Sequence, residues 1–390
     1  MAVDYAELGA RLESLALFRD LLNDEVVFAL ADYLAAPSRL AYAELAGAVY
    51  DSAQPLGEHI LDVALASDNA YVRALAEGRR PSAGALRALD LELQTLDEAA
   101  KLGSDELASL VDEGTLPPID VCEVSVADTY RERTQELGRW GYGIYAANRA
   151  FVLDDAGEIV PVLHPDETRL SDLVGYEREK AVIVENTRAL LKRLPAANIL
   201  LTGDAGTGKS STVKAVVNEL AFEGLRIIEV RKSQLHLLPG LLDELNRNPL
   251  AFILFIDDLS FSTNDDDYAA LKAILEGSVA AKSENVVVYA TSNRRHLVRE
   301  RFSDRDGDDV HLRDTLQEIA SLSERFGIRV TFARPDKDTY LGIVRGLVEQ
   351  YGIKLEECFD LDIEAERFAM RGGGRSARRA RQFVDSLRAR

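Results

Sequence analysis

The sequence predicts an all-helical N-terminal domain, then an α/β domain with a parallel sheet, then a helical lid. Three observations lead to this fold class. Apolar residues recur at helical spacing over residues 1–120, strand patterns alternate with helical ones from about residue 168, and the motif G-x-x-x-x-G-K-S joins one strand to a helix. With 390 residues the chain is long for a single core. We expect an acidic helical domain (1–125), a connector (126–167), an α/β domain (168–334) and a lid (335–390).

Charge is distributed unevenly along the chain. The net charge is -20, and residues 1–165 carry 29 acidic against 12 basic side chains. An acidic N-terminal half repels nucleic acid, so nucleic-acid binding is possible but not indicated. No apolar run approaches the ~20 residues of a membrane span, and the first residues lack a secretory signal, so we expect a cytoplasmic protein with no membrane partner. The two cysteines, Cys122 and Cys358, suggest neither a disulfide framework nor a zinc site.

The N-terminal 120 residues contain amphipathic stretches such as LESLALFRDLLNDEVVFALADYLA, broken at prolines and at GRRPSAG. Their leucine and alanine stripes indicate a packed helical core. The connector follows with a helical stretch that carries Trp140, Tyr142 and Tyr145, and these aromatic residues are expected to pack. The stretch AFVLDDAGEIVPV then predicts a β-hairpin that turns near Gly157.

Five short apolar runs in the second half predict the strands of a parallel sheet: NILLTG, LRIIEV, AFILFID, NVVVYATSN and IRVTFARP. Such runs are typical of strands that helices cover on both faces. Two helical segments after Pro335 predict the lid. The last twenty residues carry seven arginines, which we expect to face phosphates or a neighbouring subunit in preference to nucleic acid.

The phosphate-binding motif predicts an ATP site with Mg²⁺. Its glycines let backbone N–H groups turn toward phosphates, and the N-terminus of the following helix adds partial positive charge. Lys209 would reach the β and γ phosphates, and Ser210 would hold Mg²⁺. The expected nucleotide-binding residues of this loop are Gly203, Asp204, Ala205, Gly206, Thr207, Gly208, Lys209, Ser210 and Ser211.

Two adjacent acids, Asp257 and Asp258, follow the apolar run that ends at Ile256. Ligands of open α/β sheets bind at the carboxyl ends of strands, where these acids are expected. Asp257 would complete the Mg²⁺ shell, and Asp258 would orient or deprotonate the attacking water.

The order of GDAGTGKS, FIDD, ATSN, SERF and GRSARRARQF resembles the AAA+ ATPases, which have a P-loop NTPase core. The Asp-Asp pair is similar to that of bacterial replication initiators and helicase loaders. LVGYEREK, GTGKSSTVKA, FIDDLSF, YATSNRRHL and SARRARQFV together resemble a bacterial ATP-binding family known as domain of unknown function 815, over about residues 145–390.

This resemblance implies roles for further residues. Asn293 would position the attacking water beside Asp258. Arg325 would act as an arginine finger on the γ-phosphate of a neighbouring subunit, and Arg378, or Arg375 close by, would contact it from the lid. The segment from Leu173 would line the adenine pocket, with Val174, Gly175 and Tyr176 as its nucleotide-binding residues.

The resemblance also implies a five-stranded sheet in the order 5-1-4-3-2 and a homo-oligomer with nucleotide at subunit interfaces. We expect an ATPase that remodels or loads an unknown partner recruited by the N-terminal domain. A slowly hydrolysing, ATP-dependent assembly switch or scaffold is the alternative, and a kinase fits Asn293, Arg325 and the lid less well. The stretch from Leu237 to Gly240 has no aromatic residue, which disfavours a threading unfoldase.

Overall fold

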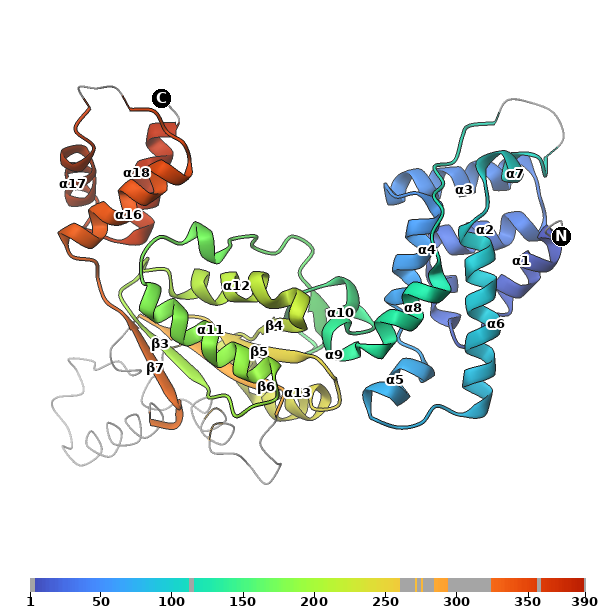
Figure 1. Cartoon of the computed structure of the whole chain (residues 1–390), viewed down its shortest axis with the longest axis horizontal. Helices are drawn as coiled ribbons and strands as arrows, with labels where there is room; N and C mark the ends of the chain where they lie inside the picture. The colour runs from blue at the N-terminus through green and yellow to red at the C-terminus, as the bar shows by residue number, and fades with distance from the viewer. Residues whose placement is uncertain are drawn as a thin grey trace. The chain divides into compact units, whose positions relative to one another are not determined.

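The computed structural model describes residues 4–111, 116–259, 284–293, 324–355 and 359–388, together with positions 271 and 275. The chain divides into two compact units, whose elements are labelled in Figure 1. The first comprises Met1–Asn148 with Arg247–Pro249, and the second comprises Arg149–Asn246 with Leu250–Arg390. This boundary lies inside the expected connector 126–167, so the connector's helices belong to the first unit and its hairpin to the second.

The first unit is helical. Short polar side chains begin several of its helices by accepting hydrogen bonds from N–H groups of the first turn, as Asp24 and Asn69 do. The elements are α1 (Tyr5–Glu13), η1 (Arg19–Asn23), α2 (Glu25–Ala35), α3 (Arg39–Ser52), α4 (Leu56–Leu65), α5 (Ala70–Ala76), α6 (Ala83–Ala100), α7 (Ser104–Ala108), α8 (Val126–Gln135), α9 (Leu137–Trp140) and α10 (Ile144–Ala147).

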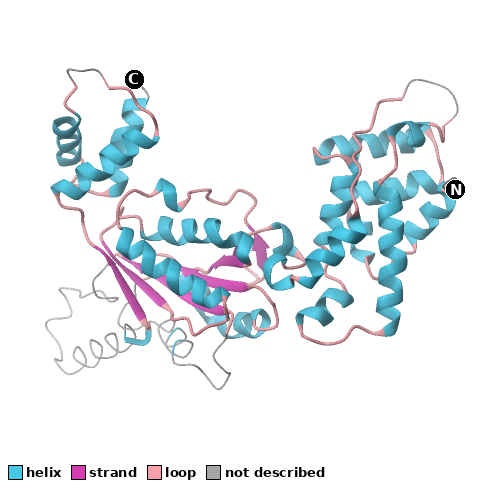
Figure 2. Ribbon diagram, in the orientation of Figure 1, coloured by secondary structure: helices cyan, strands magenta, loops and turns pink. Residues whose placement is uncertain are grey.

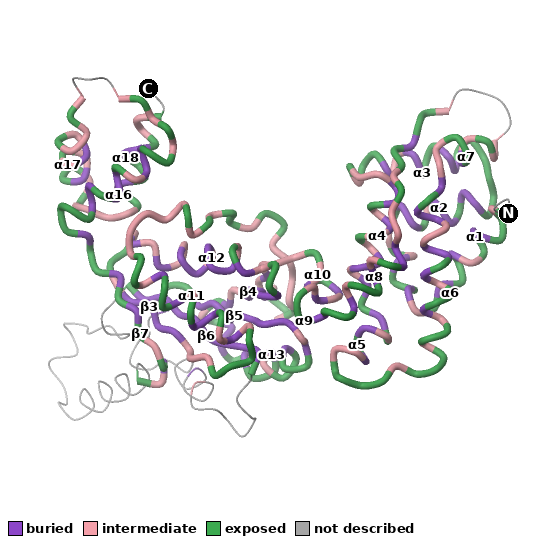
Figure 3. Tube along the Cα trace, in the orientation of Figure 1, coloured by how far each residue is buried: buried purple, intermediate pink, exposed green. Residues whose placement is uncertain are grey.

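One hydrophobic core holds this unit together, from Leu8 in α1 to Tyr130 in α8. The purple segments of its helices in Figure 3 mark the buried faces. The Tyr130 hydroxyl is satisfied inside the core by a hydrogen bond of 2.9 Å from Asn69 Nδ2. Among the connector aromatics, Tyr145 is buried, and the Trp140 ring has the guanidinium carbons of Arg133 and Arg139 over it at 4.5 and 4.7 Å.

The second unit is built on a seven-stranded, mostly parallel sheet, drawn in magenta in Figure 2. Its order is β2-β1-β4-β5-β6-β3-β7, and the β1–β2 pair alone is antiparallel among the described strands. All six residues of β5 are buried, as expected of a central parallel strand. The strands are β1 (Ala150–Leu153), β2 (Ile159–Pro161), β3 (Ile199–Gly203), β4 (Leu225–Glu229), β5 (Ala251–Ile256), β6 (Val286–Ser292) and β7 (Ile328–Phe332).

The expectation of a five-stranded sheet is corrected by the hairpin. Strand β1 pairs with β4 in parallel, with Phe151 opposite Ile228, so the hairpin extends the sheet at that edge. Burial of Phe151 and Leu153 against the sheet accounts for this addition, since an exposed β4 edge would leave backbone groups unpaired. Gln234 Nε2 donates to the carbonyl of Asp154 at 2.8 Å, which ties the hairpin turn to the segment after β4.

Two groups of helices complete the second unit. The apolar sides of α11 and α12 share one core with the sheet. The helices α16, α17 and α18 form a smaller core of their own, with Tyr340, Val344 and Phe383 among its members. They correspond to the segment expected as a lid and include α17, which was not among the two helices that the sequence predicted there. The bounds are α11 (Glu177–Leu191), α12 (Lys209–Leu220), α13 (Leu238–Leu245), α16 (Lys337–Gln350), α17 (Leu361–Arg371) and α18 (Ala377–Arg388), with short turns η2 (Leu170–Asp172), η3 (Ala221–Glu223) and η4 (Lys232–Leu237).

None of the helices in the described ranges combines the length and the apolarity needed to cross a bilayer.

Candidate functional site

The loop between β3 and α12, residues 204–208, has the backbone conformation that the phosphate-binding motif predicts, and we call it the cradle. Gly206 and Gly208 have φ values of +79° and +98°, which residues other than glycine rarely adopt. A Cβ on Gly203 would lie 2.1 Å from the carbonyl oxygen of Phe332 in β7, so only glycine fits the close approach of these strands. The motif thus ends a buried strand and begins a helix, as the sequence predicts.

Lys209 begins α12 and turns its ammonium group back into the loop. Its Nζ donates to the carbonyls of Gly203 and Asp204 at 2.8 and 2.9 Å and to Asn293 Oδ1 at 2.9 Å. Burial lowers the pKa of Lys209, and nearby Asp257, Asp258 and Asp204 oppose that shift. The Lys209 ammonium group is thus held in this loop by three neutral acceptors, which an anionic ligand can replace.

Asp257 follows β5 and is hydrogen-bonded to residues of α12 and β6. Its Oδ1 accepts a hydrogen bond of 2.7 Å from the Ser210 hydroxyl of α12 and one of 2.5 Å from the Thr291 hydroxyl of β6. The structure therefore joins the hydroxyl and the carboxylate that the sequence assigned to Mg²⁺, although 47 positions separate them. Hydroxyl and carboxylate oxygens are the ligands that Mg²⁺ prefers beside substrate phosphates.

Asp258 stands next in the chain with an unusual backbone. Its φ of +52° lies in the left-handed region, which costs a residue with a side chain of order 1–3 kcal/mol. Its carboxylate is exposed, and Oδ1 accepts a hydrogen bond of 2.7 Å from Asn293 Nδ2. Asn293 thus bridges Lys209 and Asp258, with its amide oxygen on the cation and its amide nitrogen on the acid.

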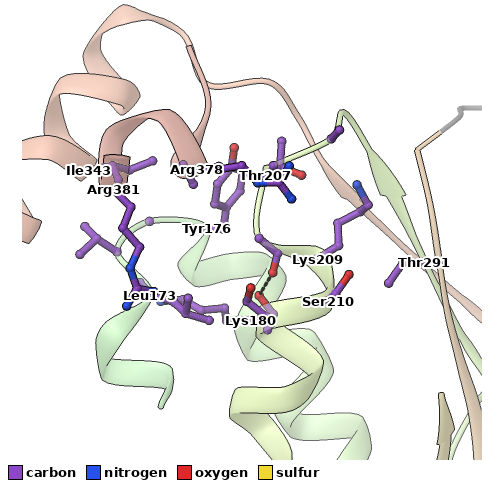
Figure 4. Close-up of a pocket in the computed structure, with 18 of the residues that line it drawn as sticks. Leu173, Tyr176, Lys180, Thr207, Lys209, Ser210, Thr291, Ile343, Arg378 and Arg381 are labelled. Carbon is purple, nitrogen blue, oxygen red and sulfur yellow. Dashed lines mark hydrogen bonds between the residues drawn. The ribbon is translucent and has the colours of Figure 1, made fainter. Parts of the chain in front are cut away.

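These groups line a cavity of about 460 Å³ in the second unit. Figure 4 shows Lys209, Ser210 and Thr291 on one side of it and Leu173, Lys180 and Arg381 on the other. The predicted residues that line it are Val174, Gly175, Tyr176, Ala205, Gly206, Thr207, Gly208, Lys209, Ser210, Ser211, Asp257, Asp258, Asn293 and Arg378. Gly203 and Asp204 contribute through their carbonyls, which accept from Lys209.

The Leu173–Tyr176 segment is shaped by its contact with the lid. Gly175 has φ +88°, and a Cβ there would lie 3.2 Å from Ile343 of α16. The Tyr176 hydroxyl donates to the carbonyl of Ala333 at 2.7 Å, and burial raises the pKa of this phenol to about 12. The apolar side chains Ile343 and Leu347 also line the cavity, and apolar lining of this kind suits a flat base.

The lid arginines separate into two kinds. Arg378 lines the cavity, and its backbone N–H donates to the Gly206 carbonyl at 3.0 Å, so α18 begins directly over the cradle. Arg375 instead forms two hydrogen bonds with the Glu366 carboxylate, at 2.8 and 2.7 Å, inside the lid. Of the two sequence candidates, Arg378 is therefore the one that the structure places at the site.

Arg325 is half-buried and lies just before β7. It is absent from the described residues that line the cavity, so the structure brings together the other predicted site residues without it.

Sequence reasoning missed several residues that line the cavity, and two of them, Thr291 and Arg381, have polar groups that matter for the chemistry of the site. Thr291 stands two positions before Asn293 in ATSN and is buried between the two acids. Arg381 lies one helical turn after Arg378 and also lines the cavity, where Figure 4 shows it reaching toward Leu173. The i, i+3 spacing was a usable signal for Arg381, because such residues share one face of a helix. No local signal marks Thr291, since its partners come from another strand.

The arrangement fits ATP with Mg²⁺ by its own chemistry. The cradle supplies glycines with positive φ and a cation, the Ser210–Asp257 pair supplies hard oxygen ligands, and the cavity has the size of small-molecule sites.

A sequence model of the family described as "Protein of unknown function (DUF815)" matches residues 146–390 of this chain. The match contains every residue of the candidate site. No curated protein matches the chain.

Proposed function

We propose that this chain, which belongs to the DUF815 family, binds ATP with Mg²⁺ and hydrolyses it to ADP and phosphate. One observation carries the proposal: Asn293 connects the cradle cation Lys209 to the exposed acid Asp258, at 2.9 and 2.7 Å. A pocket that only held nucleotide would need the cation but not an acid oriented beside it.

The side chains divide the reaction among them. Asp258 would accept a proton from water while the water oxygen forms its bond to the γ-phosphorus and the bond to the bridging oxygen of ADP breaks. Asn293 would orient Asp258, and Lys209 would offset charge on the phosphates. Ser210 and Asp257 would hold Mg²⁺, which supplies neutralisation of phosphate charge. Arg378 would contact the phosphates from the lid.

The relation to AAA+ ATPases is also part of the proposal. Numbered along the chain, the five strands β3, β4, β5, β6 and β7 lie in the order 5-1-4-3-2 within the larger sheet. A three-helix lid follows the last strand and touches the cradle through Arg378. Both features support an AAA+ type core to which the β1–β2 hairpin is added.

We propose a homo-oligomer as the active form. Arg325 is not among the described residues that line the cavity of its own chain. In related chemistry, an arginine supplied by a neighbouring subunit raises the rate by about 10³-fold or more. The acidic first unit would recruit the protein partner that hydrolysis remodels or loads. A slowly hydrolysing assembly switch is the alternative that the same geometry allows when the neighbour's arginine does not engage.

The experiment is multi-turnover phosphate release from ATP with Mg²⁺, measured over a range of protein concentrations that includes the assembled state. We expect turnover by the wild type and its loss in Asp258→Ala, with ATP binding retained because Lys209 and the cradle are intact. Lys209→Ala is expected to lose ATP binding itself.

Asp243→Asn is the matched control, because this acid is exposed on α13 and does not line the cavity. It should release phosphate like the wild type. If the wild type released no more phosphate than Asp258→Ala while still binding ATP, the switch would replace the ATPase. If it bound no ATP, both functions would be wrong.

A further inference from the structure

Thr291 lies at the carboxyl end of β6 and is 2 % exposed. Its hydroxyl oxygen accepts a hydrogen bond from the backbone N–H of Asp258 at 2.9 Å, and the same hydroxyl donates its proton to Asp257 Oδ1 at 2.5 Å. Its carbonyl also accepts from the N–H of Leu259 at 2.7 Å. One residue on β6 thus makes three hydrogen bonds to the three consecutive residues that follow β5.

The Thr291 hydroxyl is the nearer of two acceptors for the backbone N–H of Asp258. That residue has φ +52°, and its N–H is paired with Thr291 Oγ1 and, at 3.2 Å, with Asp257 Oδ1. A left-handed residue with a side chain persists only when its surroundings fix it. Without the hydroxyl, the N–H of Asp258 would keep only the longer hydrogen bond, the one to Asp257 Oδ1. The turn that points Asp258 toward Asn293 would then lose the shorter of its two hydrogen bonds.

The Thr291 hydroxyl also donates a hydrogen bond to the Asp257 carboxylate. Oδ1 of Asp257 accepts hydrogen bonds from the hydroxyls of both Ser210 and Thr291, so two elements, α12 and β6, hold this carboxylate. When Ser210 turns to a metal ion, Thr291 remains as the hydroxyl that orients this carboxylate. Partners of this kind, one step behind a metal ligand, change metal affinity or activity by about 10- to 100-fold when they are removed.

We propose that Thr291 is a positioning residue that couples the two acids: it fixes the rotamer of the metal-binding Asp257 and the backbone turn of Asp258 through a single hydroxyl. This inference rests on the proposed ATPase. It explains why the acids are oriented although both carboxylates are solvent-exposed. Thr291 itself would touch neither ATP nor the attacking water.

The test compares Thr291→Val, which keeps the shape and removes the hydroxyl, with Thr291→Ser, which keeps the hydroxyl. Two quantities are measured: phosphate release, and the Mg²⁺ concentration at which a fluorescent ATP analogue reaches half-maximal binding. We expect Thr291→Val to lower kcat and to raise the Mg²⁺ requirement by about 10- to 100-fold, while Thr291→Ser stays near the wild type. ATP-analogue binding without Mg²⁺ should not change.

Thr187→Val is the control for the loss of any buried hydroxyl. Thr187 is fully buried on α11, and its hydroxyl lies 2.8 Å from the Tyr289 hydroxyl of the same strand β6, away from the acids. It should lower the melting temperature while leaving kcat and the Mg²⁺ requirement unchanged. If Thr291→Val does not fold, Thr291→Cys replaces it, because a thiol is a weak donor and acceptor in a similar volume.

The outcomes separate this inference from the proposed function. If the wild type hydrolyses ATP and Thr291→Val matches it in both quantities, the positioning role is wrong and the ATPase stands. If the wild type binds Mg²⁺ and the ATP analogue but hydrolyses nothing, the ATPase fails, and an unchanged Mg²⁺ requirement in Thr291→Val would overturn this inference as well. If Thr291→Ser is as impaired as Thr291→Val, the hydroxyl is not the active feature.

Discussion

Lys209 and Asn293 are separated by 84 positions in the chain and joined by a hydrogen bond of 2.9 Å. Lys209 begins α12 after the cradle, and Asn293 follows the end of β6. Strands β3 and β6 pair in parallel, so their carboxyl ends lie at the same edge of the sheet. This pairing brings the cation to the amide that also holds Asp258, and several consequences can be measured.

Removal of the Asn293 amide should separate hydrolysis from binding. In Asn293→Ala, Lys209 keeps its two carbonyl acceptors, so ATP affinity should change little. Asp258 loses the donor that orients it, and we expect phosphate release to fall about 10- to 100-fold. Isothermal titration with ATP and a phosphate-release assay check the two halves. A parallel loss of affinity would show that Asn293 acts on the nucleotide instead of the acid.

The two candidate lid arginines should give opposite phenotypes. Arg378→Ala should remove the charge-assisted contact that we propose to the phosphates, worth about 1.5–3 kcal/mol, and should therefore weaken ATP binding or turnover by roughly 10- to 100-fold. Arg375→Ala breaks the two bonds to Glu366 and should lower lid stability while sparing ATP affinity. Titration of a fluorescent ATP analogue and thermal unfolding distinguish them. The reverse pattern would transfer the sensor role to Arg375.

Arg325 should act across a subunit interface. We expect Arg325→Ala to bind ATP and to lose about 10³-fold in turnover. When it is mixed with Lys209→Ala, which cannot bind ATP but keeps Arg325, the mixed assembly should regain phosphate release. Each Arg325→Ala site would then receive the arginine of its neighbour. Failure to regain activity, with mixed assemblies present by native mass spectrometry, would remove Arg325 from the site.

The Asp24–His59 pair should make the first unit sensitive to acid. Burial acts to raise the pKa of Asp24, but hydrogen bonds from His59, Val27 and Val26 outweigh it and lower this pKa below the usual 3.8. A lowered pKa contributes stability above pH 3.8 that is lost as the pH falls through the lower, folded-state value. Asp24→Asn keeps a helix cap but loses this charge, so it should be less stable by about 1 kcal/mol at neutral pH.

Thermal unfolding across pH checks this expectation, and the gap between wild type and Asp24→Asn should close below pH 3.8. Asp4→Asn provides the matched control, because Asp4 caps α1 through the N–H of Glu7. A gap for Asp24→Asn that stayed constant down to pH 2 would show that the charge of Asp24 contributes no stability.

Much of the second unit followed from local pattern. The predicted runs all became strands, as expected of short apolar segments that are buried in a parallel sheet covered by helices. The cradle followed from its glycines and its place between a strand and a helix. The number of strands did not follow, because pairing of β1 with β4 depends on where the hairpin packs after the chain has folded.

The sequence by itself determined the cradle and the two acids, because motif chemistry depends on neighbours along the chain, and its resemblance to a known family pointed to Asn293 and to an arginine at the start of the last helix. Only the tertiary structure decided that Arg378 and not Arg375 faces the cavity, and that Thr291 holds both acids. Those contacts join α17 to the turn before α18 and β5 to β6. Packing and strand register place such partners at hydrogen-bond distance, and neither can be deduced from the spacing of one motif.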